Sequence, residues 1–196
     1  MLKNRFKQFT PAARSTTTAW LVATSLAAGL FSPLAQAALK VGDNAPAFTT
    51  QAAVAGKAFD FDMAAALKKG PVVLYFFPKA FTQGCTLEAH AFAEATPYFS
   101  RMGATVVGMS HDDITTLKRF STEACRDQFA VASDPKAQTI KAYDASAAAN
   151  PERADRISYV VGQDGKIKFA HVGSDPMEHV EQTKAAVQQL QRSARP

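Results

Sequence analysis

The chain of 196 residues is 47% hydrophobic and carries 22 basic and 17 acidic side chains. Four of the basic residues lie within the first 37 residues, so the rest of the chain is close to neutral, with 18 basic and 17 acidic residues. Neither an excess nor a cluster of basic residues therefore indicates nucleic acid or an anionic membrane surface as a partner of this part.

Residues 1–37 have the pattern of an export signal. Four basic side chains precede an apolar run of about a dozen residues, and Ala35-Gln36-Ala37 is a pattern that signal peptidase accepts. A membrane anchor is the alternative, but a helix needs about 20 apolar residues to span a bilayer. We therefore expect a cleaved signal peptide over 1–37 and a single domain over 38–196. This domain would be periplasmic or secreted, with no stable membrane insertion after cleavage.

The first elements predicted after this signal are a strand and a helix. An irregular segment with Gly and Pro occupies 41–50, and alternating Phe and Asp residues then predict a half-buried strand over 56–62. A short helix is expected over 63–69. The continuous apolar run over 71–77 is typical of a central strand that is buried on both faces.

A long helix and a second buried strand are predicted next. The helix begins near Gly84, and Pro97 should end or kink it, because proline lacks the N–H that an inner helical turn needs. The strand is expected over 104–110. Either Asp112 or Asp113 can cap the helix that follows.

The stretch after that helix predicts a short strand over 129–134 and a helix over 135–144. Asp134 is the expected cap of this helix, with Pro135 at its first position. Small residues dominate 145–155, which is predicted to be a loop.

A hairpin and a helix complete the chain. The hairpin is predicted over 156–172, because Asp164-Gly165 suits the positive φ angles of a tight turn. Asp175 should cap the last helix, with Pro176 at its first position. This order of elements predicts an α/β domain of the thioredoxin-like kind, with a central mixed β-sheet flanked by helices.

Both cysteines, Cys85 and Cys125, lie after the export signal. Export delivers a chain to an oxidising compartment, where an even number of cysteines favours pairing. A domain of this length does not need a disulfide to fold, so the two cysteines are also candidates for redox chemistry.

Cys85 falls in the first turn of the predicted long helix. There the unpaired backbone N–H groups and the helix dipole favour the thiolate, which is the nucleophilic form of the side chain. Gly84 lets the backbone approach closely, and the Thr82 hydroxyl can lie near the sulfur. Pro78 ends the buried strand and restricts the loop before the helix.

The spacing of Pro78, Thr82 and Cys85, P-x-x-x-T-x-x-C, resembles the active-site motif of the peroxiredoxins. The surrounding residues are similar to those of the bacterioferritin-comigratory or Q subgroup: Lys79, Gly84, Thr86, Glu88 and Ala89. Further similar blocks follow in the same order along the chain: VGDNAPAF, VVGMSHDD, ASDP and RISYVVGQDGKI.

This resemblance implies a role for each matching residue. Cys85 would be the peroxidatic cysteine, which attacks a hydroperoxide and becomes a sulfenic acid. Thr82 would orient the peroxide, and Pro78 would shield the sulfur from water. Arg156 would stabilise the thiolate and the charge on the leaving oxygen, and Glu88 could hold that arginine.

The resemblance also implies the partners of the chain. The substrate would be hydrogen peroxide or an organic hydroperoxide, and an external dithiol would supply the electrons. Neither a cofactor nor a metal ion is expected, and His111, His171 and His179 have no metal-like spacing. Because relatives in the subgroup are often monomers, the resemblance also implies a monomer.

The chain departs from the family pattern at the second cysteine. Many members carry it five residues after the first, where this chain has His90. Cys125 lies in a region where other members carry a resolving cysteine, so it would form an intrachain disulfide with Cys85 after local unwinding of the helix. The alternative is a one-cysteine cycle resolved by an external thiol, with Cys125 buried and inert.

Other interpretations stay open at this point. Arg153 competes with Arg156 for the arginine role. A thioredoxin-like thiol–disulfide oxidoreductase normally uses C-x-x-C, and a periplasmic copper-binding assembly factor uses two cysteines about four residues apart. The chain offers only Cys85 in this region. A domain of this family that has lost its activity is the remaining alternative.

Overall fold

The computed structural model describes residues 38–193, and the predicted signal peptide over 1–37 lies outside the described residues. A seven-stranded mixed sheet runs through the domain in the order β2-β1-β5-β4-β3-β8-β9. Its strands are β1 (Thr49–Val54), β2 (Lys57–Asp62), β3 (Val72–Phe76), β4 (Thr105–Ser110), β5 (Ala130–Ser133), β8 (Ile157–Val161) and β9 (Ile167–Val172). A separate two-stranded sheet contains β6 (Ser146–Ala147) and β7 (Asn150–Ala154). The helices are α1 (Met63–Leu67), α2 (Gln83–Arg101), α3 (Ile114–Glu123), α4 (Gln138–Ala142) and α5 (Pro176–Ser193).

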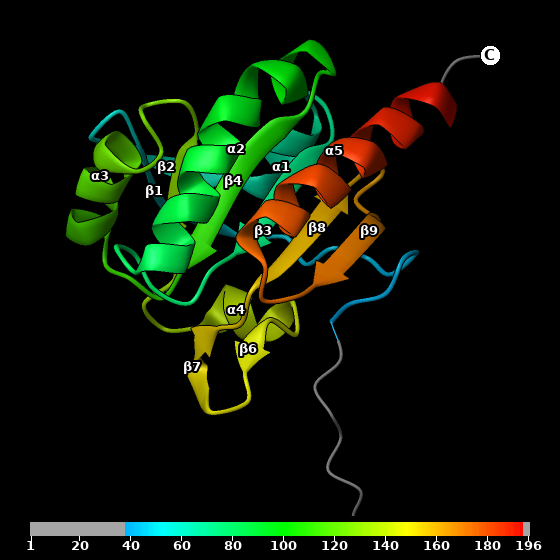
Figure 1. Cartoon of the computed structure of the whole chain (residues 1–196). Helices are drawn as coiled ribbons and strands as arrows, with labels where there is room; N and C mark the ends of the chain where they lie inside the picture. Colours follow the sequence, from blue (N-terminus) through cyan, green and yellow to red (C-terminus); the bar gives the residue numbers. More distant parts are fainter. Residues whose placement is uncertain (1–37, 194–196) are drawn as a thin grey trace, which may run out of the picture. The chain divides into compact units, whose positions relative to one another are not determined.

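The predicted mixed sheet is confirmed by the strand pairing. β4 lies between β3 and β5 and is parallel to both, whereas β8 pairs antiparallel with β3 and β9. Helices α2 and α5 lie beside each other on one face of this sheet (Figure 1). The site described below forms where the beginnings of these two helices meet the start of β8.

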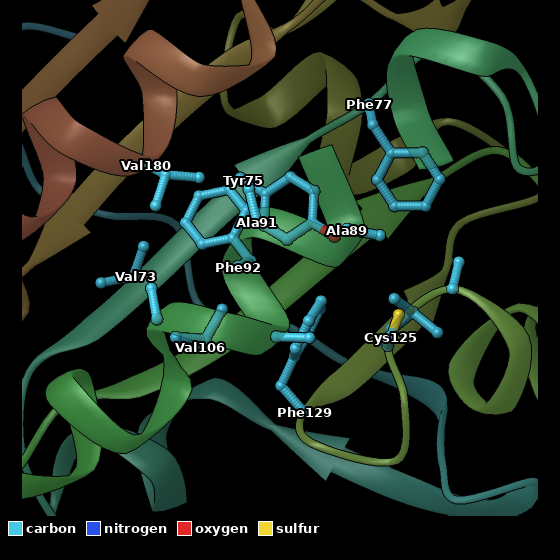
Figure 2. Packing of buried hydrophobic residues seen from close by; sticks show 14 of the residues in the cluster. Val73, Tyr75, Phe77, Ala89, Ala91, Phe92, Val106, Cys125, Phe129 and Val180 are labelled. Atoms are coloured by element: carbon cyan, nitrogen blue, oxygen red, sulfur yellow. The ribbon is translucent and has the colours of Figure 1, made fainter. Parts of the chain in front are cut away.

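β3 separates two hydrophobic cores, as its uninterrupted apolar sequence predicts. Successive side chains of a strand point to opposite faces. Val73, Tyr75 and Phe77 accordingly join the core under α2, α3 and α5, and Leu74 and Phe76 join the core on the opposite face. Figure 2 shows the first of these cores, which also contains Cys125.

Pro97 was expected to end or kink the long helix. It does not end α2, which continues through it to Arg101, and the kink stays a prediction. Phe92 and Phe99, on either side of the proline, are fully buried. Burying a phenylalanine contributes about 1.5–3 kcal/mol, so the two together offset the roughly 3 kcal/mol that a proline costs inside a helix.

Asp134 binds the first turn of α4, but the helix begins further along the chain than predicted. A turn comes first, in which Ala137 has a φ of 52°, and the helix begins at Gln138 rather than at Pro135. The Asp134 carboxylate accepts hydrogen bonds from the backbone N–H groups of Gln138 (3.0 Å) and Ile140 (2.8 Å). The capping role predicted for the Asp134 carboxylate is therefore confirmed, and the predicted start of the helix at Pro135 is wrong.

Two segments that were predicted to be irregular contain strands. β1 begins at Thr49, and the predicted loop over 145–155 forms the β6–β7 hairpin. The hairpin has a register shift between Ser146 and Ala147, and its small residues do not alternate in polarity. Without alternation the sequence carries little signal for a strand.

The remaining helix caps agree with the sequence. Asp113, rather than Asp112, caps α3 by accepting a hydrogen bond from the Thr116 N–H, and Asp175 does the same for α5 at Met177. The β8–β9 hairpin also forms, although its turn is longer than the tight one expected: the Gly162 N–H donates to the Lys166 carbonyl.

Within residues 38–193 no helix is long and apolar enough to cross a membrane. In the same range, no three His, Cys, Asp or Glu side chains form a group that could hold a metal ion.

Candidate active site

Cys85 lies in the first turn of α2, as predicted, and only 2% of it is exposed. Thr82 is the N-cap residue of this helix, so Cys85 belongs to the first turn, in which the backbone N–H groups have no partner within the helix. The sequence-based placement of the cysteine is thus confirmed at the level of the element.

Arg156 brings its positive charge to this sulfur. Its Nη2 lies 3.7 Å from Cys85 Sγ, and its Nη1 donates to Glu88 Oε2 in a buried ion pair. Arg153, the competing arginine, is exposed on β7. The structure therefore brings Cys85, Glu88 and Arg156 together.

The Glu88 carboxyl is fully buried, and this changes its acidity. Burial raises the pKa of Glu88 above its usual value near 4.5, and the Arg156 guanidinium opposes that rise. Glu88 Oε1 has no hydrogen-bond partner among the described residues. Because burial disfavours the negative charge on Glu88, more of the guanidinium charge is left to stabilise a thiolate on Cys85.

Gly84 leaves room for the guanidinium of Arg156. A Cβ at this position would lie 3.1 Å from Arg156 Nη2 and 3.9 Å from Pro176 Cγ of α5. Close approach at Gly84 was predicted from the sequence, but the sequence did not indicate that a guanidinium would occupy the space.

The loop before α2 is fixed at two points. The Ala80 N–H donates to Asp112 Oδ2 at 2.7 Å, and Thr82 Oγ1 donates to the Lys79 carbonyl at 3.0 Å. Phe81, between them, has a φ of 62°, which is rare for a bulky residue. Thr82 is exposed, and its hydroxyl makes no hydrogen bond to Cys85 among the described residues, so its lone pairs remain open to an incoming donor.

Pro78 is half-buried and lines a pocket of about 330 Å³ at the end of β3. The other lining residues come from the loops after β3, β4 and β5 and from β7: Lys79, His111, Asp112, Asp113, Pro135 and Arg153. A larger hollow of about 460 Å³ lies between β2, α1 and the starts of β4 and β5. No residue of the predicted site lines it, so size alone does not identify the site.

Cys125 follows α3 and is completely buried, in the same hydrophobic core as Cys85. Both cysteines are free thiols. Burial, together with the nearby Asp127, raises the pKa of Cys125 well above that of an ordinary thiol. In this conformation Cys125 is therefore a poor nucleophile.

Tyr75 is a member of this environment that the sequence did not reveal. Its side chain is fully buried next to Phe92 (Figure 2), and its hydroxyl has no partner among the described residues. Tyr75 pairs with Ser158 of β8, two residues from Arg156. Burial raises the pKa of Tyr75, as do Cys125, Glu88 and Cys85, whereas Arg156 opposes the rise. Its only signal in the sequence is one hydroxyl within an apolar strand.

Comparison with known proteins places the chain in a family. Residues 41–170, about two thirds of the sequence, match the profile of the AhpC/TSA family. The chain belongs to the AhpC/TSA family. The peroxiredoxin resemblance inferred from the motif around Cys85 is thereby confirmed.

Two curated relatives show how much of its length this AhpC/TSA chain shares with known proteins. Chloroplastic peroxiredoxin Q of Populus jackii is 32% identical over 124 residues, which cover 63% of this chain and 58% of the relative. A chain named as a peroxiredoxin in Mycobacterium tuberculosis (strain CDC 1551 / Oshkosh) is 32% identical over 147 residues, which cover 72% and 90%. The chain thus spans little more than half the length of the first relative.

Solved structures support the thioredoxin-like fold of this AhpC/TSA chain. Peroxidoxin BcpB from Mycobacterium tuberculosis superimposes with a TM-score of 0.70 at 24% identity, covering 81% of this chain and 99% of that one. AhpC of the same organism gives a TM-score of 0.71 at 21% identity, with 81% and 96% covered. At these identities the likeness concerns the fold alone.

Proposed function

We propose that this chain is a thiol peroxidase that reduces hydrogen peroxide or organic hydroperoxides through Cys85. The observation that carries the proposal is the 3.7 Å contact between Arg156 Nη2 and Cys85 Sγ at the start of α2. A fixed cation beside a buried sulfur at a helix N-terminus favours the thiolate, which is the form that attacks an O–O bond. Membership of the AhpC/TSA family, which includes the peroxiredoxin relatives, supports the same chemistry.

The first step oxidises Cys85 and reduces the peroxide. The thiolate attacks one peroxide oxygen, an S–O bond forms, and the O–O bond breaks with its electron pair leaving on the second oxygen. That oxygen takes up a proton and departs as water or an alcohol, and Cys85 becomes a sulfenic acid. Arg156 stabilises the charge that develops on the leaving oxygen.

The loop before α2 would hold the peroxide. Thr82 Oγ1 already donates its proton to the Lys79 carbonyl, so it can accept the hydroxyl hydrogen of a peroxide. Pro78, half-buried at the end of β3, would limit the access of water to the sulfur.

Cys125 would resolve the sulfenic acid. Its thiolate would displace water from the Cys85 sulfur and form an intrachain disulfide, which an external dithiol then reduces. Because Cys125 is buried and its pKa is raised, this step requires local unfolding that exposes it. An external thiol that reacts directly with the sulfenic acid is the alternative.

The location and assembly of the protein belong to the same proposal. The composition of residues 1–37 favours export to the periplasm or the exterior, with the domain over 38–196 acting as a monomer. Sequencing the N-terminus of the exported protein should give Ala38 as its first residue, and a protein that retains residues 1–37 would contradict cleavage.

A peroxide-consumption assay tests the proposed activity. The purified chain, supplied with dithiothreitol, should consume hydrogen peroxide, and Cys85→Ser should abolish the reaction. Cys125→Ser should retain the first turnover, since only Cys85 reacts with peroxide. Peroxide consumption by Cys85→Ser at the rate of the unsubstituted chain would refute the assignment.

A further inference from the structure

His179 is a fully buried histidine of α5 with both ring nitrogens in hydrogen bonds. Its Nδ1 lies 2.8 Å from Ser158 Oγ on β8, and its Nε2 lies 2.9 Å from the Gly173 carbonyl oxygen. A buried imidazole that bonds on both sides ties two segments of the chain together, in this case β8 and the turn between β9 and α5.

The groups around His179 determine its protonation. Burial, together with His171 and Arg156, lowers the pKa of His179 to about 4, whereas the bond to Gly173 and the Asp175 carboxylate act in the opposite direction. The ring is therefore neutral near pH 7. Because the Gly173 carbonyl can only accept, Nε2 carries the hydrogen and Nδ1 accepts from the Ser158 hydroxyl.

Both residues that His179 binds lie next to Arg156: Ser158 follows it in the sequence, and Gly173 lies beside it in space. Ser158, on β8, lies two residues after Arg156, which precedes the strand in a bend. The side chain of Arg156 contacts Cys85 and Glu88 of α2, and that of Ser158 contacts His179 of α5, so both side chains lie on the side of the sheet that these two helices cover. The Gly173 N–H lies 3.4 Å from the Arg156 carbonyl oxygen. The backbone around Arg156 is thus held on one side through Ser158 and on the other through Gly173.

We infer that His179 and Ser158 form a positioning pair that holds Arg156 in its place beside Cys85. This inference rests on the proposed peroxidase function. Neither side chain touches the reacting atoms, so the pair acts only through the position of the guanidinium. The Arg156 guanidinium must reach Cys85 Sγ and Glu88 Oε2 at once, and this leaves little tolerance for a shift of its backbone.

Loss of the His179–Ser158 pair should change the position of Arg156 relative to Cys85 Sγ. Without the imidazole, the buried Ser158 hydroxyl and the Gly173 carbonyl lose their partners, and the β9–α5 turn can move relative to β8. A displacement of about 1 Å at a reacting centre can slow a reaction by about a hundredfold. We expect a smaller change here, because the Glu88 ion pair still anchors the guanidinium.

The test measures the first oxidation of Cys85 in full-length variants by stopped flow with hydrogen peroxide. His179→Leu should lower the second-order rate constant by about tenfold, and Ser158→Ala by about threefold. Both should also make alkylation of Cys85 by iodoacetamide more dependent on pH, because a displaced guanidinium stabilises the thiolate less. A purely structural role would not move this second readout.

Thr183→Val is the matched control. Thr183 is also fully buried on α5, but its hydroxyl donates only to carbonyls of its own helix, those of His179 and Val180. Its rate constant should stay within twofold of the unsubstituted chain.

Each outcome decides one question. A folded His179→Leu that reacts within twofold of the unsubstituted chain would overturn the inference, and so would an equal loss in Thr183→Val. If His179→Leu does not fold, Ser158→Ala decides by the same criterion. Failure of the unsubstituted chain to react with peroxide would instead count against the proposed function itself.

Discussion

At the scale of single residues, the central feature is one guanidinium shared by two acidic groups. Arg156 points Nη2 at Cys85 and Nη1 at Glu88, and both of these partners are buried. The planar fork of an arginine can satisfy both partners at once, whereas the ammonium of a lysine presents a single charged point. The shape of the side chain should therefore matter as well as its charge.

Substitutions of Arg156 should separate these two properties. Arg156→Met removes the charge and should slow the oxidation of Cys85 by about 10²–10³-fold, which is the usual loss for a group that stabilises developing negative charge. Arg156→Lys should lose less, about tenfold. Stopped-flow measurement with hydrogen peroxide gives both rate constants. Arg153→Met, at the exposed arginine on β7, is the control and should react normally. Equal rates for the Arg156 and Arg153 variants would exclude the assigned role.

Gly84→Ala tests the space that the guanidinium occupies. The new Cβ would lie 3.1 Å from Arg156 Nη2, a tight contact that requires the guanidinium to shift by a few tenths of an ångström. We expect the rate of Cys85 oxidation to fall by about tenfold while the circular dichroism spectrum stays unchanged, because alanine is compatible with a helix. Gln83→Ala, at the exposed neighbouring residue, should leave the rate unaltered. If both variants react alike, steric displacement of Arg156 is not the cause.

At the scale of elements, the start of one helix and the end of another place the two cysteines in the same hydrophobic core. Cys85 lies in the first turn of α2, and Cys125 follows α3, where its N–H donates to the Phe120 carbonyl. A disulfide requires Cα atoms within about 7 Å. Both thiols are buried and unpaired, so a disulfide between them would require these two helix ends to open.

Hydrogen exchange should detect this opening. After one equivalent of peroxide, amides in the first turns of α2 and over 121–129 should exchange faster, and intact mass should show a disulfide between Cys85 and Cys125. Cys125→Ser should show neither change and should accumulate the sulfenic acid. A stable sulfenic acid in the unsubstituted chain would instead support resolution by an external thiol.

The reliability of the sequence-based predictions differed between kinds of element. The run over 71–77 predicted β3 correctly, because burial on both faces requires continuous apolar residues. Pro97 does not end α2, because the packing of Phe92 and Phe99 outweighs the local preference of proline. The β6–β7 hairpin could not be predicted, because its pairing depends on neighbours and not on alternation.

The same distinction applies to the site. Cys85, Gly84 and Glu88 lie within five residues of one helix, so a short motif was enough to find them. Arg156 was found only through the family resemblance. Tyr75 and His179 come near the site through strand pairing and helix packing, which no local pattern in the sequence specifies.

At the scale of the whole molecule, the buried imidazole of His179 links stability to pH. The pKa of His179 falls from 6.5 to about 4 on folding, so between these values the unfolded chain binds a proton that the folded chain does not. The contribution of His179 to the free energy of unfolding should therefore decrease by up to about 3 kcal/mol as the pH falls from about 6.5 to 4.

Denaturant unfolding at a series of pH values measures this linkage. As the pH falls over the stated range, the stability of the unsubstituted chain should decrease relative to that of His179→Gln, because glutamine does not titrate. The raised pKa of Glu88 acts in the opposite direction, but it is common to both chains. His111→Gln, at a half-buried histidine outside this core, serves as the control and should follow the unsubstituted chain. Parallel pH profiles for the unsubstituted chain and His179→Gln would contradict a buried neutral imidazole.

The most direct test of the account is the rate at which iodoacetamide alkylates Cys85 in Cys125→Ser as the pH is raised from 7 to 9. Because Arg156 Nη2 lies 3.7 Å from Cys85 Sγ and favours the thiolate, the rate should change little over this range, and adding Arg156→Met should make it rise with pH. A rate that rises steeply in the presence of Arg156, as for an ordinary thiol with a pKa of about 8.5, would contradict the account.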